Sequence, residues 1–120
     1  MPNIKSSTAV AVNGVEYTET FRFTFSDVVN FLSESMDDPK SYVDKQLNEF
    51  EGKIEVFPCG CRISPVLEKL GCLRYRECIT NDGYRILYTY DEQEKLVTAH
   101  AILSKKQDVQ HLLFKRIISI

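Results

Sequence analysis

Residues 73–103 read LRYRECITNDGYRILYTYDEQEKLVTAHAIL and predict the main sheet of this protein. Two runs in it, residues 73–80 and 84–90, alternate in side-chain character as half-buried strands do. The NDG triplet between them is a tight-turn signal for a hairpin. Residues 96–103 then form a nearly unbroken apolar run, which suits a central strand covered on both faces. We therefore expect a three-stranded antiparallel meander.

Upstream of the meander, residues 17–25 predict another strand. In this segment, YTETFRFTF, the side chains of Tyr17, Phe21, Phe23 and Phe25 share one parity, and threonines and an arginine dominate the other. Alternation with a period of two, in residue types that favour strands, indicates a strand with one buried face.

Two helices are expected between that strand and the meander. The first is short and begins at a Ser26-Asp27 cap, and the second begins at Asp38, with Pro39 tolerated in the first helical position. The second is the clearest amphipathic segment of the chain, because its apolar residues recur at steps of three and four. These residues are Val43, Leu47, Phe50 and Ile54. A short break between two consecutive helices predicts an antiparallel helical hairpin.

The two ends of the chain complete the predicted architecture. Residues 108–118 carry apolar side chains at helical spacing and predict a short C-terminal helix. Residues 1–14 are weakly patterned and form an N-terminal extension, a tail or a short extra strand, so the domain is expected to span residues 15–120. An N-terminal strand, a helical hairpin, an antiparallel meander and a short terminal helix define an α+β domain.

Composition limits the setting in which this chain works. A chain of 120 residues suits one domain. It has no apolar run near the roughly 20 residues that cross a bilayer, and its start lacks a signal-peptide pattern. We expect a cytoplasmic protein without membrane contact.

Charge is distributed unevenly along the chain. Residues 1–60 carry 5 Lys/Arg against 10 Asp/Glu, and residues 61–120 carry 10 Lys/Arg against 7 Asp/Glu. The basic second half suits an anionic partner, although charge alone favours an ordinary solvated face.

The four cysteines do not predict a metal site. Zinc sites are usually built from two C-x(2–4)-C pairs, whereas Cys59 and Cys61 are separated by one residue, and Cys72 and Cys78 by five. A C-x-C ring is strained, which also argues against a Cys59–Cys61 redox pair. We expect reduced structural thiols, no zinc and no cofactor.

Several motifs, in this order, resemble the ParE/RelE toxin family of bacterial type II toxin–antitoxin systems. Residues 57–60 (FPCG) and 65–71 (PVLEKLG) resemble the family's exit from the second helix and the loop after it. Residues 74–77 (RYRE) resemble the first strand of its meander, and residues 83–88 (GYRILY) resemble its Tyr-Arg-apolar-apolar-Tyr motif. Residues 101–108 (AILSKKQD) resemble its final strand, basic pair and Asp. The likeness spans roughly residues 15–116.

The resemblance implies a toxin that a cognate antitoxin neutralises, and it leaves two mechanisms open. ParE-like members inhibit DNA gyrase by binding, and RelE-like members cut messenger RNA on the ribosome. The ParE-like branch is favoured, because it often shows a basic pair, an Asp and an amphipathic helix after the last strand. That similarity predicts a gyrase-binding surface at Lys105, Lys106, Asp108, Leu112 and Leu113. The chain is then not an enzyme. A scaffold that acts only as a non-toxic binding module is a further alternative.

The ribonuclease alternative has its own candidate residues. RelE-like members use clustered Lys/Arg with a Tyr or His, and here His111 with Arg85 and Lys106 would supply these groups, with the ribosome and messenger RNA as partners. Leu112 and Leu113 stand where nuclease members keep a tyrosine, which counts against it. His100, within an apolar strand, is interpreted as a satisfied core or edge histidine.

The antitoxin is expected on the meander. Arg74, Arg76 and Arg85 lie on adjacent predicted strands, where their guanidinium groups can form one anion-binding cluster. Together with Tyr84, they are the predicted antitoxin contacts. The alternative for the arginines is a solvated face that pairs with nearby acids.

Overall fold

The computed structural model describes residues 14–107, and residues 1–13 and 108–120 lie outside the described part. Five strands form one mixed sheet in the order β1-β5-β4-β3-β2. β1 is parallel to β5, and the other neighbouring pairs are antiparallel. The elements are β1 (Gly14–Tyr17), α1 (Glu19–Leu32), α2 (Pro39–Val56), β2 (Arg62–Ile63), α3 (Pro65–Lys69), β3 (Arg76–Ile79), β4 (Arg85–Asp91) and β5 (Leu96–Leu103). The α+β class is therefore confirmed, with more strands than predicted.

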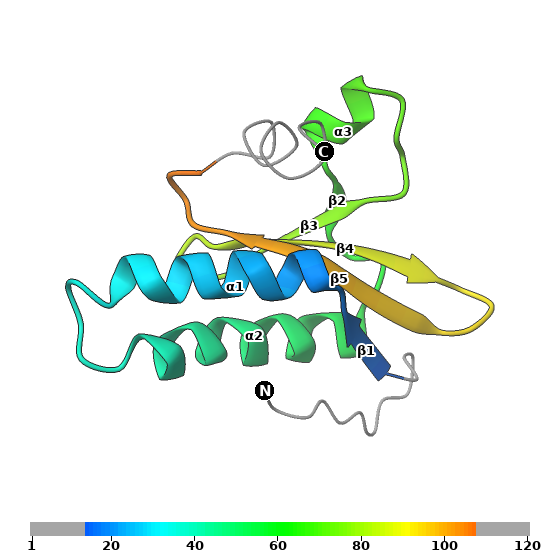
Figure 1. Cartoon of the computed structure of the whole chain (residues 1–120). Helices are drawn as coiled ribbons and strands as arrows, with labels where there is room; N and C mark the ends of the chain where they lie inside the picture. The colour runs from blue at the N-terminus through cyan, green and yellow to red at the C-terminus, as the bar shows by residue number, and fades with distance from the viewer. Residues whose placement is uncertain (1–13, 108–120) are drawn as a thin grey trace.

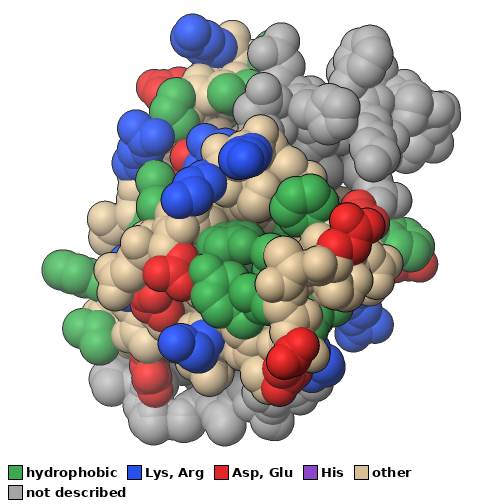
Figure 2. Space-filling model, turned by 90° about the vertical axis from the view of Figure 1, so that its left-hand side faces the viewer, with side chains coloured by type: hydrophobic (Ala, Val, Ile, Leu, Met, Phe, Trp, Pro, Cys, Tyr) green, Lys and Arg blue, Asp and Glu red, His purple; other side chains and the backbone are tan. Residues whose placement is uncertain are grey.

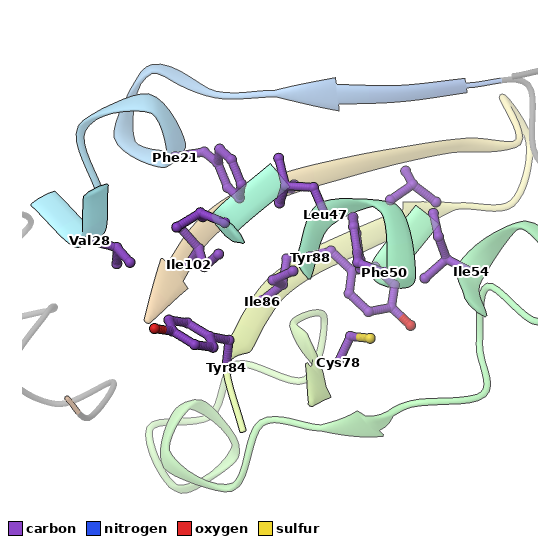
Figure 3. Packing of buried hydrophobic residues seen from close by; sticks show 13 residues of the cluster. Phe21, Val28, Leu47, Phe50, Ile54, Cys78, Tyr84, Ile86, Tyr88 and Ile102 are labelled. Carbon is purple, nitrogen blue, oxygen red and sulfur yellow. The ribbon is translucent and has the colours of Figure 1, made fainter. Parts of the chain in front are cut away.

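The sheet has an apolar cluster on each face. The hairpin of α1 and α2 packs on one face, and α3 lies on the other side (Figure 1). The larger, helix-side cluster joins side chains of α1 and α2 to those of the central strands, among them Phe21, Phe50, Ile86 and Tyr88 (Figure 3). The smaller cluster consists of Leu67, Leu87, Ala101 and Leu103. Coverage of both faces explains why residues 96–103 are almost continuously apolar.

The predicted strand at residues 17–25 is wrong, because only Tyr17 belongs to β1 and residues 19–25 are helical. Phe21 and Phe25 are four apart, a spacing that suits a strand face and a helix face equally. Phe23 distinguishes the two patterns, and it is 49% exposed rather than buried. The Thr18 side chain accepts a hydrogen bond from the Phe21 N–H and caps the helix. The predicted cap at Ser26-Asp27 therefore lies inside α1.

Two threonines extend the contact between the first segment and β5. β1 pairs with β5 only as far as Tyr17 and Ala99. Beyond that point, the Thr18 hydroxyl donates to the His100 carbonyl at 3.3 Å, and the Ile102 N–H donates to the Thr24 hydroxyl at 3.0 Å. Thr24 is buried, so α1 satisfies a strand edge that would otherwise lack partners.

The meander is confirmed in order and pairing. β3 pairs with β4 in a regular register, and β4 pairs with β5 with a register irregularity between Leu87 and Tyr88. The first strand is shorter than predicted, because only Arg76–Ile79 are in β3. The hairpin turn is closed by the Thr80 N–H, which donates to the Tyr84 carbonyl at 2.8 Å. Gly83 has a φ of 93° in this turn, the left-handed region that glycine adopts without strain.

α2 follows its predicted pattern and adds a polar stripe beside the apolar one. Asp38 accepts from the Ser41 N–H, and Pro39 is the first helical residue, as predicted. The polar stripe recurs at steps of four, three and four and bonds to residues 79–82. Tyr42 and Gln46 donate to the Asp82 carboxylate, Glu49 accepts from the Asn81 N–H, and Lys53 donates to the Ile79 carbonyl. The stripe fixes the β3–β4 turn against the helix.

The predicted loop around Ser64-Pro65 contains two short elements instead, β2 and α3. Pro65 is at the start of α3, and Leu67 is buried against the sheet. Gly71, with a φ of 86°, ends the turn, and its N–H donates to the Glu68 carbonyl at 2.9 Å. The pairing of β2 with β3 depends on tertiary contact, since two residues are too few for a sequence signal.

No helix among residues 14–107 is long and apolar enough to cross a membrane.

Candidate functional site

A hollow of about 400 Å³ lies at the end of the sheet where β5 finishes. It is lined by Phe31 of α1, Tyr42 of α2, the β3–β4 turn and the turn after β5. In full, the lining residues are Phe31, Tyr42, Asn81, Asp82, Tyr84, Ser104, Lys105 and Lys106. Figure 2 views the molecule from the side on which the α1–α2 turn lies, and shows a hydrophobic area with basic and acidic side chains around it. The hollow thus combines cationic, aromatic and hydrogen-bonding groups.

Residues 104–107, here called the lysine corner, form a turn held from both sides. The Ser104 N–H donates to the Gln107 side chain at 2.9 Å, and the Gln107 N–H donates to the Ser104 carbonyl at 3.1 Å. Arg85 of β4 donates from Nη2 to the Gln107 carbonyl. These bonds leave Lys105 and Lys106 exposed at the tip of the turn. Lys105 also packs against Gly83, where a Cβ atom would approach its Cδ within 3.3 Å.

Asp82 organises the polar wall of the hollow. The Tyr42 hydroxyl donates to it at 2.8 Å and Gln46 Nε2 at 3.0 Å. These hydrogen bonds lower the pKa of Asp82, and Lys45 and Lys105 act in the same direction. Burial and the bond to Asp82 raise the pKa of Tyr42 to about 12. Burial also raises the pKa of Tyr84, whose ring meets that of Tyr42 at 6.0 Å.

This arrangement is suited to binding anions more than to exchanging protons. Two exposed ammonium groups can neutralise phosphate or carboxylate groups, and the tyrosine rings and Phe31 can contact apolar or aromatic parts of the same ligand. A general acid or base works best with a pKa near the operating pH. Tyr42 is far from that value, so the hollow has a poor proton donor at neutral pH.

The predicted arginine cluster is not formed. Arg76 pairs with Tyr88 and Arg85 with Ile79, at opposite ends of the β3–β4 ladder. Cys78 pairs with Ile86, and both lie in the helix-side cluster. Because successive residues of a strand alternate between faces, Arg76 belongs to the helix side and Arg85 to the other. The prediction that β3 and β4 are neighbouring strands is confirmed, but the side chains of Arg76 and Arg85 lie on opposite faces of the sheet.

Each strand arginine is engaged with backbone. Arg76 donates from Nη1 to the carbonyls of Cys61 and Cys59, at 2.7 and 3.3 Å, and Arg85 binds Gln107 as described. Arg74 is exposed, with its guanidinium 5.7 Å from the centre of the Tyr75 ring. Glu77, the acid on β3, does not pair with these three arginines, because it is buried and bonds to Ser64, with Arg62 3.6 Å away.

The remaining predicted residues divide into two groups. His100 is half-buried, with Nε2 3.0 Å from the Thr89 hydroxyl and its ring against Tyr75, as expected of a satisfied histidine. Burial lowers its pKa. Asp108, His111, Leu112 and Leu113 lie outside the described residues, as does the predicted C-terminal helix.

The sequence interpretation missed most of the hollow. The residues not predicted as site residues are Phe31, Tyr42, Asn81, Asp82 and Ser104, although Asn81 and Asp82 were recognised as turn residues. The signal for Tyr42 was present, because it begins the polar stripe next to the apolar face of α2. That stripe could be identified as a contact only once its partner turn was known.

The cysteines occupy both faces of the sheet. Cys78 and Cys61 pack in or against the helix-side cluster, and Cys72 packs against the Leu67 cluster on the other side. Cys59 is exposed. Between residues 14 and 107, no group of three or more His, Cys, Asp or Glu side chains is arranged to hold a metal ion.

Comparison of the sequence with protein-family models and with curated proteins gives no match in either case.

Proposed function

We propose that this chain is a toxin of a bacterial type II toxin–antitoxin pair, resembling the ParE-like branch, and that it inhibits DNA gyrase by binding. It would act in the cytoplasm and be neutralised by a cognate antitoxin. In this proposal the chain breaks no bond in its target and needs no cofactor.

The observation that carries the proposal is the element order. A first strand, a helical hairpin and an antiparallel three-stranded meander follow one another as the resemblance implies. The first strand joins the sheet beside the last one. β2 and α3 are additions to that expected order. The motif at residues 83–88 falls on the hairpin turn and β4, and residues 101–107 of the last motif fall on β5 and the turn after it.

The lysine corner is the proposed contact with gyrase. Lys105 and Lys106 are exposed, and Phe31, 69% exposed, lies beside them in the hollow. A cationic surface with an apolar neighbour suits a protein interface, in which aromatic anchors supply most of the affinity and charges guide the encounter. Asp108, Leu112 and Leu113 stay part of this proposal, although they lie outside the described residues.

The antitoxin would approach from the meander. Arg74 is the most available of the three proposed arginines, since Arg76 and Arg85 already donate to loop carbonyls. Acidic side chains of a segment that folds on binding would then pair first with Arg74. Tyr84 is 7% exposed, so it would contribute through the hollow rather than as an open surface.

Induction of the chain alone in a bacterium tests the toxin proposal. Growth should stop, and co-expression of the antitoxin, sought in the neighbouring reading frame, should restore it. The double variant Lys105→Ala/Lys106→Ala should lose toxicity and no longer inhibit supercoiling by purified gyrase. The matched control Lys69→Ala/Lys95→Ala removes two exposed lysines that do not line the hollow and should stay toxic. Normal growth with abundant folded protein would leave the non-toxic binding module.

One observation favours the ribonuclease as a second candidate. Two lysines and two tyrosines meet in the hollow, the groups with which an RNA-cleaving site could hold phosphate and move protons. The raised pKa values of both tyrosines argue against this use. If it holds, Tyr84→Phe or His111→Ala should slow cleavage of ribosome-bound messenger RNA by roughly 10²-fold. Message cleavage by the purified chain, with gyrase unaffected, would replace the ParE-like assignment.

A further inference from the structure

Two cysteines from different segments face each other at the β2 edge of the sheet. β2 pairs with β3 through Ile63–Arg76 and Arg62–Glu77, and one step further this register brings Cys61 opposite Cys78. Directly opposite residues of an antiparallel pair have Cα atoms about 4.5–5.5 Å apart. A disulfide needs about 4.4–6.8 Å. The two thiols are also close enough for each to shift the pKa of the other.

The two thiols differ in exposure to solvent: that of Cys61 is accessible and that of Cys78 is enclosed. Cys61 is half-buried, whereas Cys78 is completely buried in the helix-side cluster. Figure 3 shows the Cys78 side chain next to Tyr88, whose hydroxyl donates to the Pro58 carbonyl at 2.7 Å. A small oxidant can therefore reach Cys61 first, and Cys78 can react only with a partner already in contact with it.

The electrostatics favour the thiolate at Cys61. The hydrogen bond from Cys78 is the largest influence that lowers the pKa of Cys61, and Tyr88, Lys53 and Arg76 act in the same direction against the effect of burial. The same bond and burial raise the pKa of Cys78. Since Tyr88 has one hydroxyl proton, it can serve either the Pro58 carbonyl or the Cys61 sulfur at a given moment. A reactive thiolate beside a protonated thiol is the arrangement found in redox-sensing cysteine pairs.

The other cysteines lack these features. Cys59 is exposed on the same loop, but the structure gives it no thiol partner. Cys72 lies on the other face of the sheet. Arg76 binds the carbonyls of both Cys59 and Cys61, which holds this loop against β3 with the Cys61 side chain on the Cys78 side. We call residues 58–62 the cysteine corner.

We propose that Cys61 and Cys78 form a peroxide-reactive pair that closes reversibly to a disulfide. The Cys61 thiolate attacks one oxygen of a hydroperoxide, breaks the O–O bond and becomes a sulfenic acid, and the other oxygen leaves as hydroxide or alkoxide, which takes up a proton. The Cys78 sulfur then attacks the Cys61 sulfur, and water leaves with the Cys78 proton. Two thiols are oxidised and one peroxide is reduced, and a dithiol reductant reverses the change.

The disulfide would tie the cysteine corner to β3. In the reduced chain, β2 contributes only two residues to the sheet. A covalent bond between the loop after α2 and β3 would close the chain around α3, which lies between the two cysteines. Closing a loop restricts the unfolded chain, so the oxidised protein should melt at a higher temperature than the reduced one.

The test uses the reduced full-length chain and hydrogen peroxide. Intact mass should show the loss of two hydrogen atoms, and peptide mapping should show a Cys61–Cys78 bridge that a dithiol removes. Cys59→Ser and Cys72→Ser, the matched controls, should form the same bridge. Cys78→Ser should instead accumulate a sulfenic acid at Cys61 that dimedone traps.

The wild-type chain alone can overturn the proposal, so a Cys78 variant that fails to fold does not matter. A bridge between Cys59 and Cys61, oxidation mainly at Cys59 or Cys72, or intact thiols after a free-thiol standard has reacted would each contradict it. In the pH dependence of alkylation by iodoacetamide, Cys61 should react below the pH range of an ordinary thiol, whose pKa is about 8.5. Reaction of Cys61 only in the ordinary range would remove the reactive thiolate on which the first step depends.

Discussion

The lysine corner and the cysteine corner are each held by hydrogen bonds from a strand arginine to loop carbonyls. The two arginines lie at opposite ends of the β3–β4 ladder. Arg85 donates to a carbonyl of the first, and Arg76 donates to two carbonyls of the second. Their outcomes differ. The lysine corner presents charged side chains to solvent, whereas the cysteine corner presses a thiol against a buried neighbour.

The difference follows from what each loop packs on. The cysteine corner continues from α2 and lies along the helix-side cluster, so its side chains meet apolar groups and Tyr88. The lysine corner extends past the end of β5, where it lies beside the hairpin turn and the polar and aromatic side chains that line the hollow. Arginine suits both positions, because its planar fork satisfies carbonyls while its stem packs on the sheet. A strand arginine that looks like a partner contact can therefore be part of the scaffold.

The largest effect is expected from Arg76→Met, which keeps the apolar stem and removes both bonds to the cysteine corner. Hydrogen bonds from a charged group contribute about 1.5–3 kcal/mol each, with losses that are not additive. Unfolding in urea should show a loss of about 2–3 kcal/mol. The exposed neighbour Arg74→Met, which loses only a ring contact, should cost less than about 1 kcal/mol. Equal losses would mean that Arg76 does not anchor this loop.

Gly83→Ala tests how tightly the hairpin turn and the lysine corner fit together. The new Cβ must adopt a φ of 93° and approach Lys105 within 3.3 Å. A left-handed backbone in a non-glycine residue costs about 1–2 kcal/mol. The matched control is Gly52→Ala in α2, where a Cβ meets nothing within 4 Å and the helix should gain about 0.5–1 kcal/mol. Thermal unfolding should shift in opposite directions for the two variants.

Arg85→Met should affect the lysine corner but destabilise the protein less than Arg76→Met. Arg85 makes one bond to this turn, and its buried Nε has no hydrogen-bond partner among the described groups, so removing the guanidinium relieves part of the loss. We expect a cost of about 1 kcal/mol. Amide hydrogen exchange of residues 104–107 should increase, while exchange at residues 61–63 stays unchanged. An increase at both corners would show that they are not independent.

The smallest effect concerns acid stability. The folded pKa of Asp82 is lowered by Tyr42 and Gln46, so its bonds contribute stability above the unfolded value of about 3.9, and this is lost as the pH falls through the folded pKa. Wild-type protein should be more stable than Asp82→Asn at pH 7, and the difference should shrink below about pH 4. Tyr42→Phe removes one donor and should give a partial effect. Parallel pH profiles for wild type and Asp82→Asn would contradict this.

The sequence interpretation was most accurate for the elements whose structure is fixed by contacts between residues close together in the chain. The second helix and the meander were predicted well, because a Pro39 start, a recurring apolar face and an NDG turn act within a few residues. The first helix was predicted, but its start at residues 19–25 was mistaken for a strand, because Phe21 and Phe25 fit both periods and Phe23 was taken as buried. The cap at Thr18 was the overlooked local signal.

The candidate sites were harder to predict than the elements. Lys105 and Lys106 were identified as a pair, but Tyr42 and Asp82 join them only through the docking of α2 on the hairpin turn. Arg76 and Arg85 were expected together, yet strand parity places them on opposite faces. Cysteine spacing gave no hint of Cys61 and Cys78, because the residues between them fold into β2 and α3.

By itself, the sequence determined the α+β class, the amphipathic second helix and the antiparallel meander. Each of these follows from the periodic burial of side chains, and this pattern can be recognised within a single segment of the sequence. Only the tertiary structure decided that β1 lies parallel to β5, that α2 holds the Asp82 turn, and that Cys61 meets Cys78. These contacts join segments far apart in the chain, and which segments meet is set by the packing of all the elements together rather than by the pattern within any one of them.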